Sequence, residues 1–275
     1  ILSYDKPAEI FKIRDGVSAF TVRYQLASES RGIKPTQGLM DAPAAAGDEV
    51  RTLVRKQELG ALSVAQPSQL VKNLEAGKPQ LLVYYGTSLT AAGKWTGQLN
   101  EQLKERYGEL ITVENRAVGG VDSNWGLKNI EARVLPLNPD TVTIEFSMND
   151  AIKSREISIE LARENLLKMV DALKRNNPDV EVILLTMNPQ GGRPAERSIE
   201  HPYYRGLLPE YYQMVRNFAA SQKLRLIDIN AEWKEWRDAN PDEFARHVAD
   251  GVHPDESSCR TVALPAMMQG VGNVA

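Results

Sequence analysis

The chain has 275 residues, of which 42% are hydrophobic and 25% are charged, and its formal net charge is -3. These values are ordinary for a folded globular protein and exclude intrinsic disorder as its main state. The balance of charge argues against a nucleic-acid partner, because neutralising phosphates requires a basic face. No apolar run approaches the ~20 residues that span a bilayer. A single cysteine, Cys259, excludes an internal disulfide and a zinc site built from several thiolates.

Residues 1–66 are expected to form a small β-rich N-terminal appendage. Ile10–Ile13 and Phe20–Leu26 are strand candidates, and apolar and polar residues alternate along the second. The Asp15-Gly16 pair between them is a turn signal, so a β-hairpin is expected. The chain begins at Ile1 and shows no signal peptide, from which we expect a processed or truncated form and favour a secreted or periplasmic protein.

Residues 67–275 alternate strand-like and helix-like segments. Short runs rich in Val, Ile and Leu predict strands at Gln80–Tyr85, Ile111–Asn115, Thr141–Ser147, Glu181–Thr186 and Arg225–Asp228. Apolar residues at helical spacing predict helices between them, at Trp95–Tyr107, Ile157–Arg175 and Pro209–Gln222. This alternation predicts an α/β domain with a parallel sheet that is covered on both faces.

The segments that follow the strands carry the candidate site, because ligands of open parallel sheets bind beyond the carboxyl ends of the strands. Ser88 follows the first strand, Gly119-Gly120 the second and Asn149 the third, and Asp250 and His253 lie in a later loop. A serine hydroxyl is a weak nucleophile until a base removes its proton, a role that His253 can fill with Asp250 holding the imidazole. The amides of Ser88 and Gly120 and the Asn149 side chain are candidate oxyanion donors.

Two other histidines compete for the role of base. His201 lies in a loop after the fourth predicted strand, where a surface histidine is the ordinary case, and His247 lies in a predicted helix. Four further residues are candidate substrate contacts, although aromatic residues at such places more commonly pack. They are Trp95, Tyr203, Tyr204 and Arg205.

The four blocks, in this order, resemble the GDSL/SGNH family of serine hydrolases over residues 80–270. The blocks are Gly86-Thr87-Ser88-Leu89, Asn115-x-x-Val118-Gly119-Gly120, Asn149-Asp150 and Asp250-x-x-His253-Pro254. The resemblance implies a three-layer α/β/α sandwich with a flavodoxin-like sheet of about five strands, and neither a metal nor an organic cofactor. It also implies a Ser88, His253 and Asp250 triad, with an oxyanion hole of Ser88, Gly120 and Asn149.

One residue departs from the family pattern. Thr87 stands where the first block usually has Asp. Because the family accommodates Asp on this turn, we expect Thr87→Asp to be tolerated.

The expected activity is hydrolysis of carboxylic esters of a small molecule or glycan. Carbohydrate O-acetyl esters are favoured, because no long apolar lid helix for lipid is visible and a β-rich appendage resembles accessory domains of some carbohydrate esterases in this family. Lipid esters and thioesters are the alternatives within the family, and a non-catalytic ligand-binding module on this fold is the alternative of another class. Retention of Ser88, Asp250 and His253 argues against such a module. A phosphate loop at Gly93-Lys94 is excluded, because Ser88 stands at its first glycine position and Trp95 at its Ser/Thr position.

Overall fold

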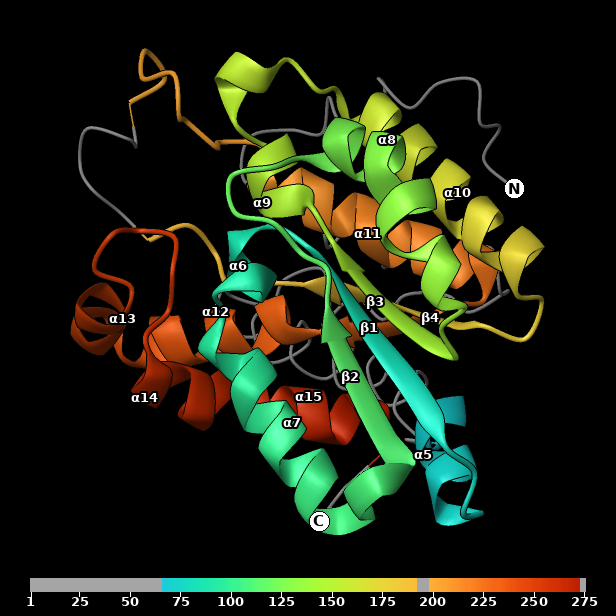
Figure 1. Cartoon of the computed structure of the whole chain (residues 1–275). Coiled ribbons are helices and arrows are strands. Elements are labelled where there is room, and N and C mark those ends of the chain that lie inside the picture. The colour runs from blue at the N-terminus through green and yellow to red at the C-terminus, as the bar shows by residue number, and fades with distance from the viewer. Residues whose placement is uncertain (1–65, 192–197, 273–275) are drawn as a thin grey trace, which may run out of the picture. The chain divides into compact units, whose positions relative to one another are not determined.

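The computed structural model describes residues 66–191 and 198–272 (Figure 1). The expected hairpin at Ile10–Ile13 and Phe20–Leu26 lies outside the described residues. Within them, five parallel strands form one sheet in the order β2-β1-β3-β4-β5. The strands are β1 (Gln80–Gly86), β2 (Ile111–Asn115), β3 (Thr141–Glu145), β4 (Glu181–Thr186) and β5 (Arg225–Asp228).

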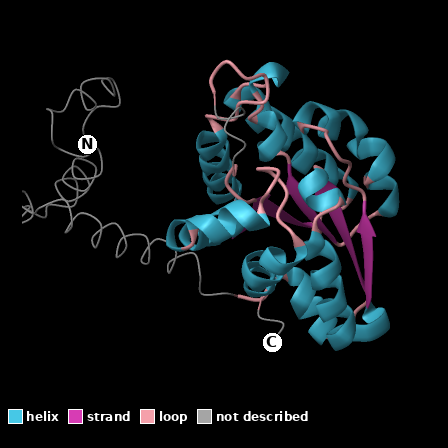
Figure 2. Cartoon of the chain, turned by 90° about the vertical axis from the view of Figure 1, so that its left-hand side faces the viewer, coloured by secondary structure: helices cyan, strands magenta, loops and turns pink. Residues whose placement is uncertain are grey.

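Helices cover both faces of the sheet, which confirms the expected three-layer α/β/α sandwich (Figure 2). One layer contains α7 (Lys94–Tyr107), α12 (Ile229–Ala239) and α15 (Leu264–Val271). The opposite layer contains α8 (Ser123–Arg133), α10 (Ile159–Asn176) and α11 (Leu208–Gln222). The shorter helices are α5 (Gln69–Glu75), α6 (Ser88–Ala91), α9 (Ser147–Asp150), α13 (Pro241–His247) and α14 (Glu256–Ser258). None of the helices in the described ranges is both long and apolar enough to cross a bilayer.

Strand β1 shows how the sequence is buried on both faces. Tyr84 and Tyr85 are both fully buried, and as neighbours on a strand they point to opposite sides of the sheet. The Tyr84 hydroxyl donates to Asn100 of α7 at 2.7 Å, whereas the Tyr85 hydroxyl donates to the Gly126 carbonyl of α8 at 2.7 Å. The hydroxyl of each buried tyrosine therefore has a hydrogen-bond acceptor, as a buried polar group requires.

The topology places its switch point at the carboxyl ends of β1 and β3. From β1 the chain crosses to β2 through α7, and it then returns through α8 on the opposite face to form β3 on the other side of β1. Ligands of doubly wound sheets bind at such a switch point. Strand β3 ends at Glu145, two residues earlier than predicted, because Ser147 begins the short helix α9.

Candidate active site

The first element of the site is the tight turn between β1 and α6. Thr87 caps α6, and its hydroxyl oxygen accepts the Leu89 amide at 3.2 Å. Ser88, the first residue of α6, is half-buried between two buried neighbours. Trp95 is only 1% exposed, and its indole donates to the Leu89 carbonyl at 2.8 Å. Trp95 therefore packs against α6, which is the commoner of the two roles expected for it.

The structure brings Ser88, His253 and Asp250 into one hydrogen-bonded chain. Ser88 Oγ lies 2.7 Å from His253 Nε2, and His253 Nδ1 lies 2.6 Å from Asp250 Oδ2. The other carboxylate oxygen of Asp250 accepts the main-chain amide of His253 at 2.7 Å. The carboxylate thus holds the ring through Nδ1, which leaves Nε2 to accept the proton of Ser88. This arrangement can activate a serine for attack on an acyl carbon.

The Asp250 carboxyl is kept ionised by its own loop. Partial burial favours its neutral form, but the His253 amide and ring and the Val252 amide donate to it and hold its pKa below the usual range. Gly251 has φ +83°, a backbone conformation that side chains rarely adopt, and it lets the loop bend between Asp250 and His253.

The segment after β4 supports that loop. The Gly191 amide donates to the Gly251 carbonyl at 2.8 Å, and the fully buried Asn188 side chain donates to the Val252 carbonyl at 2.9 Å. The loop that carries Asp250 and His253 is therefore fixed to the sheet at two points. Nothing in the local sequence around Asn188 indicates this role, because Val252 lies 64 residues away.

The loop after β2 approaches the nucleophile from the other side. A side chain on Gly119 would begin 3.7 Å from Ser88 Cβ, so the two residues are neighbours. Gly120 has φ +76° and is exposed. Arg155 donates to both the Gly120 carbonyl and the Asp122 carboxylate, and Asp122 also caps α8. Arg155 therefore fastens the Gly119–Asp122 loop, a role that sequence reasoning missed.

Asn149 projects from α9 at the end of β3. Its side chain is buried, and its amide donates to the Val121 carbonyl at 2.7 Å. That bond uses one of the two N–H groups of the amide and fixes its plane. The second N–H makes no hydrogen bond among the described residues. It is therefore free to donate to a developing oxyanion.

The two other candidates for the general base, His201 and His247, form hydrogen bonds with residues other than Ser88 and Asp250. The His201 ring accepts the Tyr203 amide at 3.2 Å. The His247 ring lies 2.8 Å from Asp255, whose carboxylate raises the pKa of that histidine. Tyr203 is 53% exposed, whereas Arg205 is buried and donates to the Met148 carbonyl at 2.9 Å, beside Asn149.

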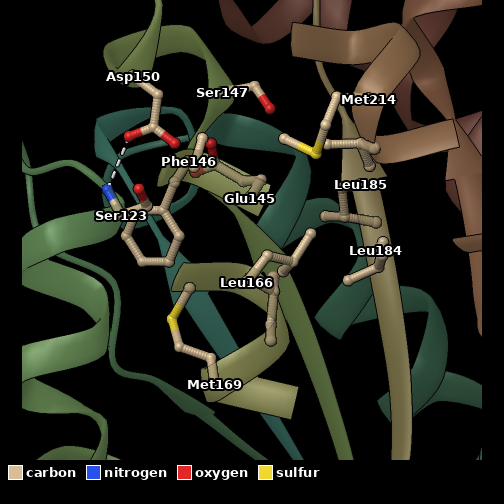
Figure 3. A pocket seen from close by; sticks show the side chains of 13 residues that line it. Ser123, Glu145, Phe146, Ser147, Asp150, Leu166, Met169, Leu184, Leu185 and Met214 are labelled. Carbon is tan, nitrogen blue, oxygen red and sulfur yellow. Dashed lines mark hydrogen bonds between the residues drawn. The ribbon is translucent and has the colours of Figure 1, made fainter. Parts of the chain in front are cut away.

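Two buried carboxyl groups, those of Glu145 and Asp150, line a cavity of about 20 Å³ (Figure 3). Burial raises the pKa of Glu145 to about 7, and it raises the pKa of Asp150 to about 7 as well. Asp150 accepts the Ser123 amide at 2.7 Å, at the start of α8. Glu145 is the charged last residue of a strand that is otherwise made of Thr, Val and Ile, and that was the one sequence signal for it. Within residues 66–191 and 198–272, no cluster of His, Cys, Asp or Glu side chains could hold a metal ion.

Comparison with known proteins gives one family. Residues 83–258 match the model of the GDSL-like Lipase/Acylhydrolase family. A GDSL esterase/lipase from Arabidopsis thaliana is 26% identical over 191 residues, which cover 62% of this chain and 77% of the plant protein. The matched range contains the turn at Ser88, the Gly119–Asp122 loop, Asn149, Asp250 and His253.

Solved structures with the same fold include esterases. A putative GDSL-like lipase from Parabacteroides merdae is 17% identical, with a TM-score of 0.62 over 76% of this chain and 99% of the other. An acetylxylan esterase from Geobacillus stearothermophilus is 20% identical, with a TM-score of 0.59 over 71% of this chain and 95% of the other.

Proposed function

Because the chain belongs to the GDSL-like lipase/acylhydrolase family and is a carboxylic ester hydrolase, we propose that it removes O-acetyl groups from carbohydrates through an acyl-enzyme on Ser88. The observation that carries the mechanism is the 2.7 Å contact between Ser88 Oγ and His253 Nε2, with Asp250 2.6 Å behind the ring. A lipid ester or thioester substrate, and a ligand-binding module, are the alternatives.

The first half of the reaction acylates the serine. His253 Nε2 takes the proton of Ser88 as Oγ attacks the ester carbonyl carbon. The negative charge that forms on the carbonyl oxygen is stabilised by the amides of Ser88 and Gly120 and by the Asn149 side chain. The tetrahedral intermediate then expels the sugar hydroxyl, which receives the proton from the imidazolium, and acetyl-Ser88 remains.

The second half frees the enzyme. His253 takes a proton from a water molecule, whose oxygen attacks the acetyl carbonyl of acetyl-Ser88 at the same oxyanion donors. Collapse of this second intermediate releases acetate and returns the proton to Ser88 Oγ. Asp250 stays ionised throughout, because the hydrogen bonds from its own loop hold its pKa low. It stabilises the imidazolium in both halves.

The choice of a carbohydrate acetyl ester draws on the solved structures of the same fold. One is described as an acetyl-xylooligosaccharide esterase. Catalytic mutants of that esterase change a serine, an aspartate and a histidine, and the last two lie three positions apart. Asp250 and His253 have the same spacing. The half-buried Ser88 and the exposed His253 also suit a substrate whose acetyl group is carried on a bulky chain.

The test is acetate release from acetylated xylooligosaccharides, run beside p-nitrophenyl acetate, butyrate and palmitate. We expect kcat/KM to be highest for acetyl esters and to fall as the acyl chain lengthens. Preference for palmitate over acetate would favour the lipid alternative. Hydrolysis of p-nitrophenyl acetate without acetate release from any acetylated glycan would contradict the proposed substrate. A protein with no esterase activity that still binds glycans would favour the ligand-binding module.

A further inference from the structure

One buried carboxylate accepts several hydrogen bonds from the turn that carries Ser88. Glu145, the last residue of β3, is 3% exposed. Its Oε1 accepts the Thr87 amide at 2.6 Å, the Thr87 hydroxyl at 2.9 Å and the Thr90 hydroxyl at 2.8 Å. The Thr87 hydroxyl also lies 3.1 Å from Oε2. One carboxylate oxygen therefore binds donors on both sides of Ser88.

The backbone is shaped to let this carboxylate approach. A Cβ on Gly86 would lie 2.4 Å from Glu145 Oε1, closer than any side chain tolerates. The glycine that ends β1 thus leaves the space that the carboxylate occupies. The contact is non-local, because Glu145 and Thr87 are 58 residues apart, and it joins the two strands on either side of the switch point.

Burying an ionised carboxylate at this position costs free energy. No salt bridge to Glu145 is present within residues 66–191 and 198–272, so the charge is met by neutral donors alone. Burial without a cation disfavours the ionised form. A group that only filled space would be apolar, and one kept buried and perturbed beside a reactive residue is characteristic of functional sites.

The hydrogen bonds explain what the carboxylate does to the turn. The Thr87 hydroxyl has one hydrogen, and directing it to Glu145 leaves an oxygen lone pair for the Leu89 amide. That second bond caps α6 at the residue before Ser88. Thr90, two residues after Ser88, also donates to Glu145. Because the carboxylate binds a threonine on each side of Ser88, it sets the direction of the first turn of α6. It therefore sets where Ser88 Oγ lies relative to His253.

We propose that Glu145 is a positioning residue for the nucleophile, supplying from β3 the carboxylate that the family's first block usually carries at residue 87. The inference rests on the proposed role of Ser88. It also reverses the expectation that Thr87→Asp is tolerated, because an Asp at residue 87 would face Glu145 within hydrogen-bonding distance, and two buried carboxylates repel each other.

The first test compares two substitutions of Glu145, with kcat and KM measured on p-nitrophenyl acetate per active site as titrated by a serine-directed phosphonate. Glu145→Gln keeps an oxygen acceptor for the donors of Thr87 and Thr90, and we expect its kcat to stay within about threefold of wild type. Glu145→Leu removes the acceptor, and we expect kcat to fall about 10–100-fold with KM nearly unchanged, because small misplacements of a reacting group are costly.

A matched control separates positioning from stability. Asp228→Asn alters another largely buried carboxylate at a strand end, and we expect a lower melting temperature with unchanged kcat per active site. If Glu145→Leu does not fold, Thr90→Val removes a single donor to Glu145, and we expect a kcat about three- to tenfold lower at a similar melting temperature.

The third test moves the carboxylate from residue 145 to residue 87. We expect Thr87→Asp alone to lower both kcat and the melting temperature, and Thr87→Asp combined with Glu145→Leu to be more active than either single variant. The proposal is overturned if Glu145→Leu or Thr90→Val matches wild type per active site, if Glu145→Gln loses activity as severely as Glu145→Leu, or if the double variant is no better than Glu145→Leu. Failure of the phosphonate to label Ser88 in the wild type would instead refute the proposed function.

Discussion

Asn188 donates its side-chain amide to the Val252 carbonyl at 2.9 Å, which ties the end of β4 to the loop that carries Asp250 and His253. Asn188→Leu keeps the volume but leaves that buried carbonyl without its donor, which costs roughly 1–3 kcal/mol. We expect a lower melting temperature and a lower kcat on p-nitrophenyl acetate, because the loop is no longer fixed. Unchanged values of both quantities would show that the Gly191–Gly251 contact alone holds the loop.

Asn149→Ala should slow turnover while leaving substrate affinity nearly intact. An oxyanion donor acts on the transition state, so we expect kcat to fall about 10²–10³-fold and KM to change little. The control is Asn165→Ala, which removes a buried asparagine of α10 whose amide donates to Ser123 and Asn124. If both variants lose stability equally and neither loses kcat per active site, Asn149 is a structural residue only.

The two buried carboxyl groups make stability depend on pH. Glu145 and Asp150 both have pKa values of about 7 in the folded protein, above the ordinary values of 4.5 and 3.8. The unfolded chain therefore releases their protons first as pH rises, so their contribution to the free energy of unfolding falls between about pH 4 and pH 7 and levels off above. At about 1.4 kcal/mol per pKa unit, each of the two groups contributes on the order of 3 kcal/mol to this fall.

Thermal melts between pH 4.5 and 6.5 measure this effect. In this window the groups with lowered pKa values, among them Asp228 and Asp250, are already ionised in both states. Glu145→Gln and Asp150→Asn should each flatten the dependence of melting temperature on pH. A wild-type melting temperature that rises through this window would contradict the assignment.

The ion pair at the end of β5 should matter for stability and not for catalysis. Arg216 donates to both oxygens of Asp228 at 2.8 Å and, against the effect of burial, holds the pKa of that carboxyl low. Arg216→Met strands a largely buried charge, and we expect a loss of about 2–4 kcal/mol. Lys168→Met breaks an exposed pair with Glu164 and should leave the melting temperature unchanged. Equal effects of the two substitutions would refute the argument from burial.

Local patterns in the sequence predicted the strands of the sheet and several of the residues that meet at the candidate site. Apolar runs predicted the strands, and the polar segments after them predicted which side chains meet at the carboxyl edge, including Ser88 and His253. The pattern does not decide between two roles where a residue's partner sets its role. Trp95 was a candidate substrate contact, although packing is the commoner role near a helix start, and its indole donates to the Leu89 carbonyl.

The supporting contacts were not predictable from the sequence. Glu145 meets Thr87 across 58 residues, and Asn188 meets Val252 across 64. Such pairs leave no periodicity and no short motif, because their spacing is set by the fold. A charged residue at the end of a strand of Thr, Val and Ile was the one clue to Glu145, and it did not indicate a partner.

Covalent labelling tests the central claim most directly. The wild-type protein is treated with a serine-directed phosphonate, its intact mass and residual esterase activity are followed together, and the labelled peptide is sequenced. We expect one phosphonyl group per chain on Ser88, activity lost in proportion to labelling, and neither labelling nor more than about 10⁻⁴ of the wild-type turnover in Ser88→Ala. Labelling at another serine, or near wild-type turnover by a folded Ser88→Ala, would contradict the account.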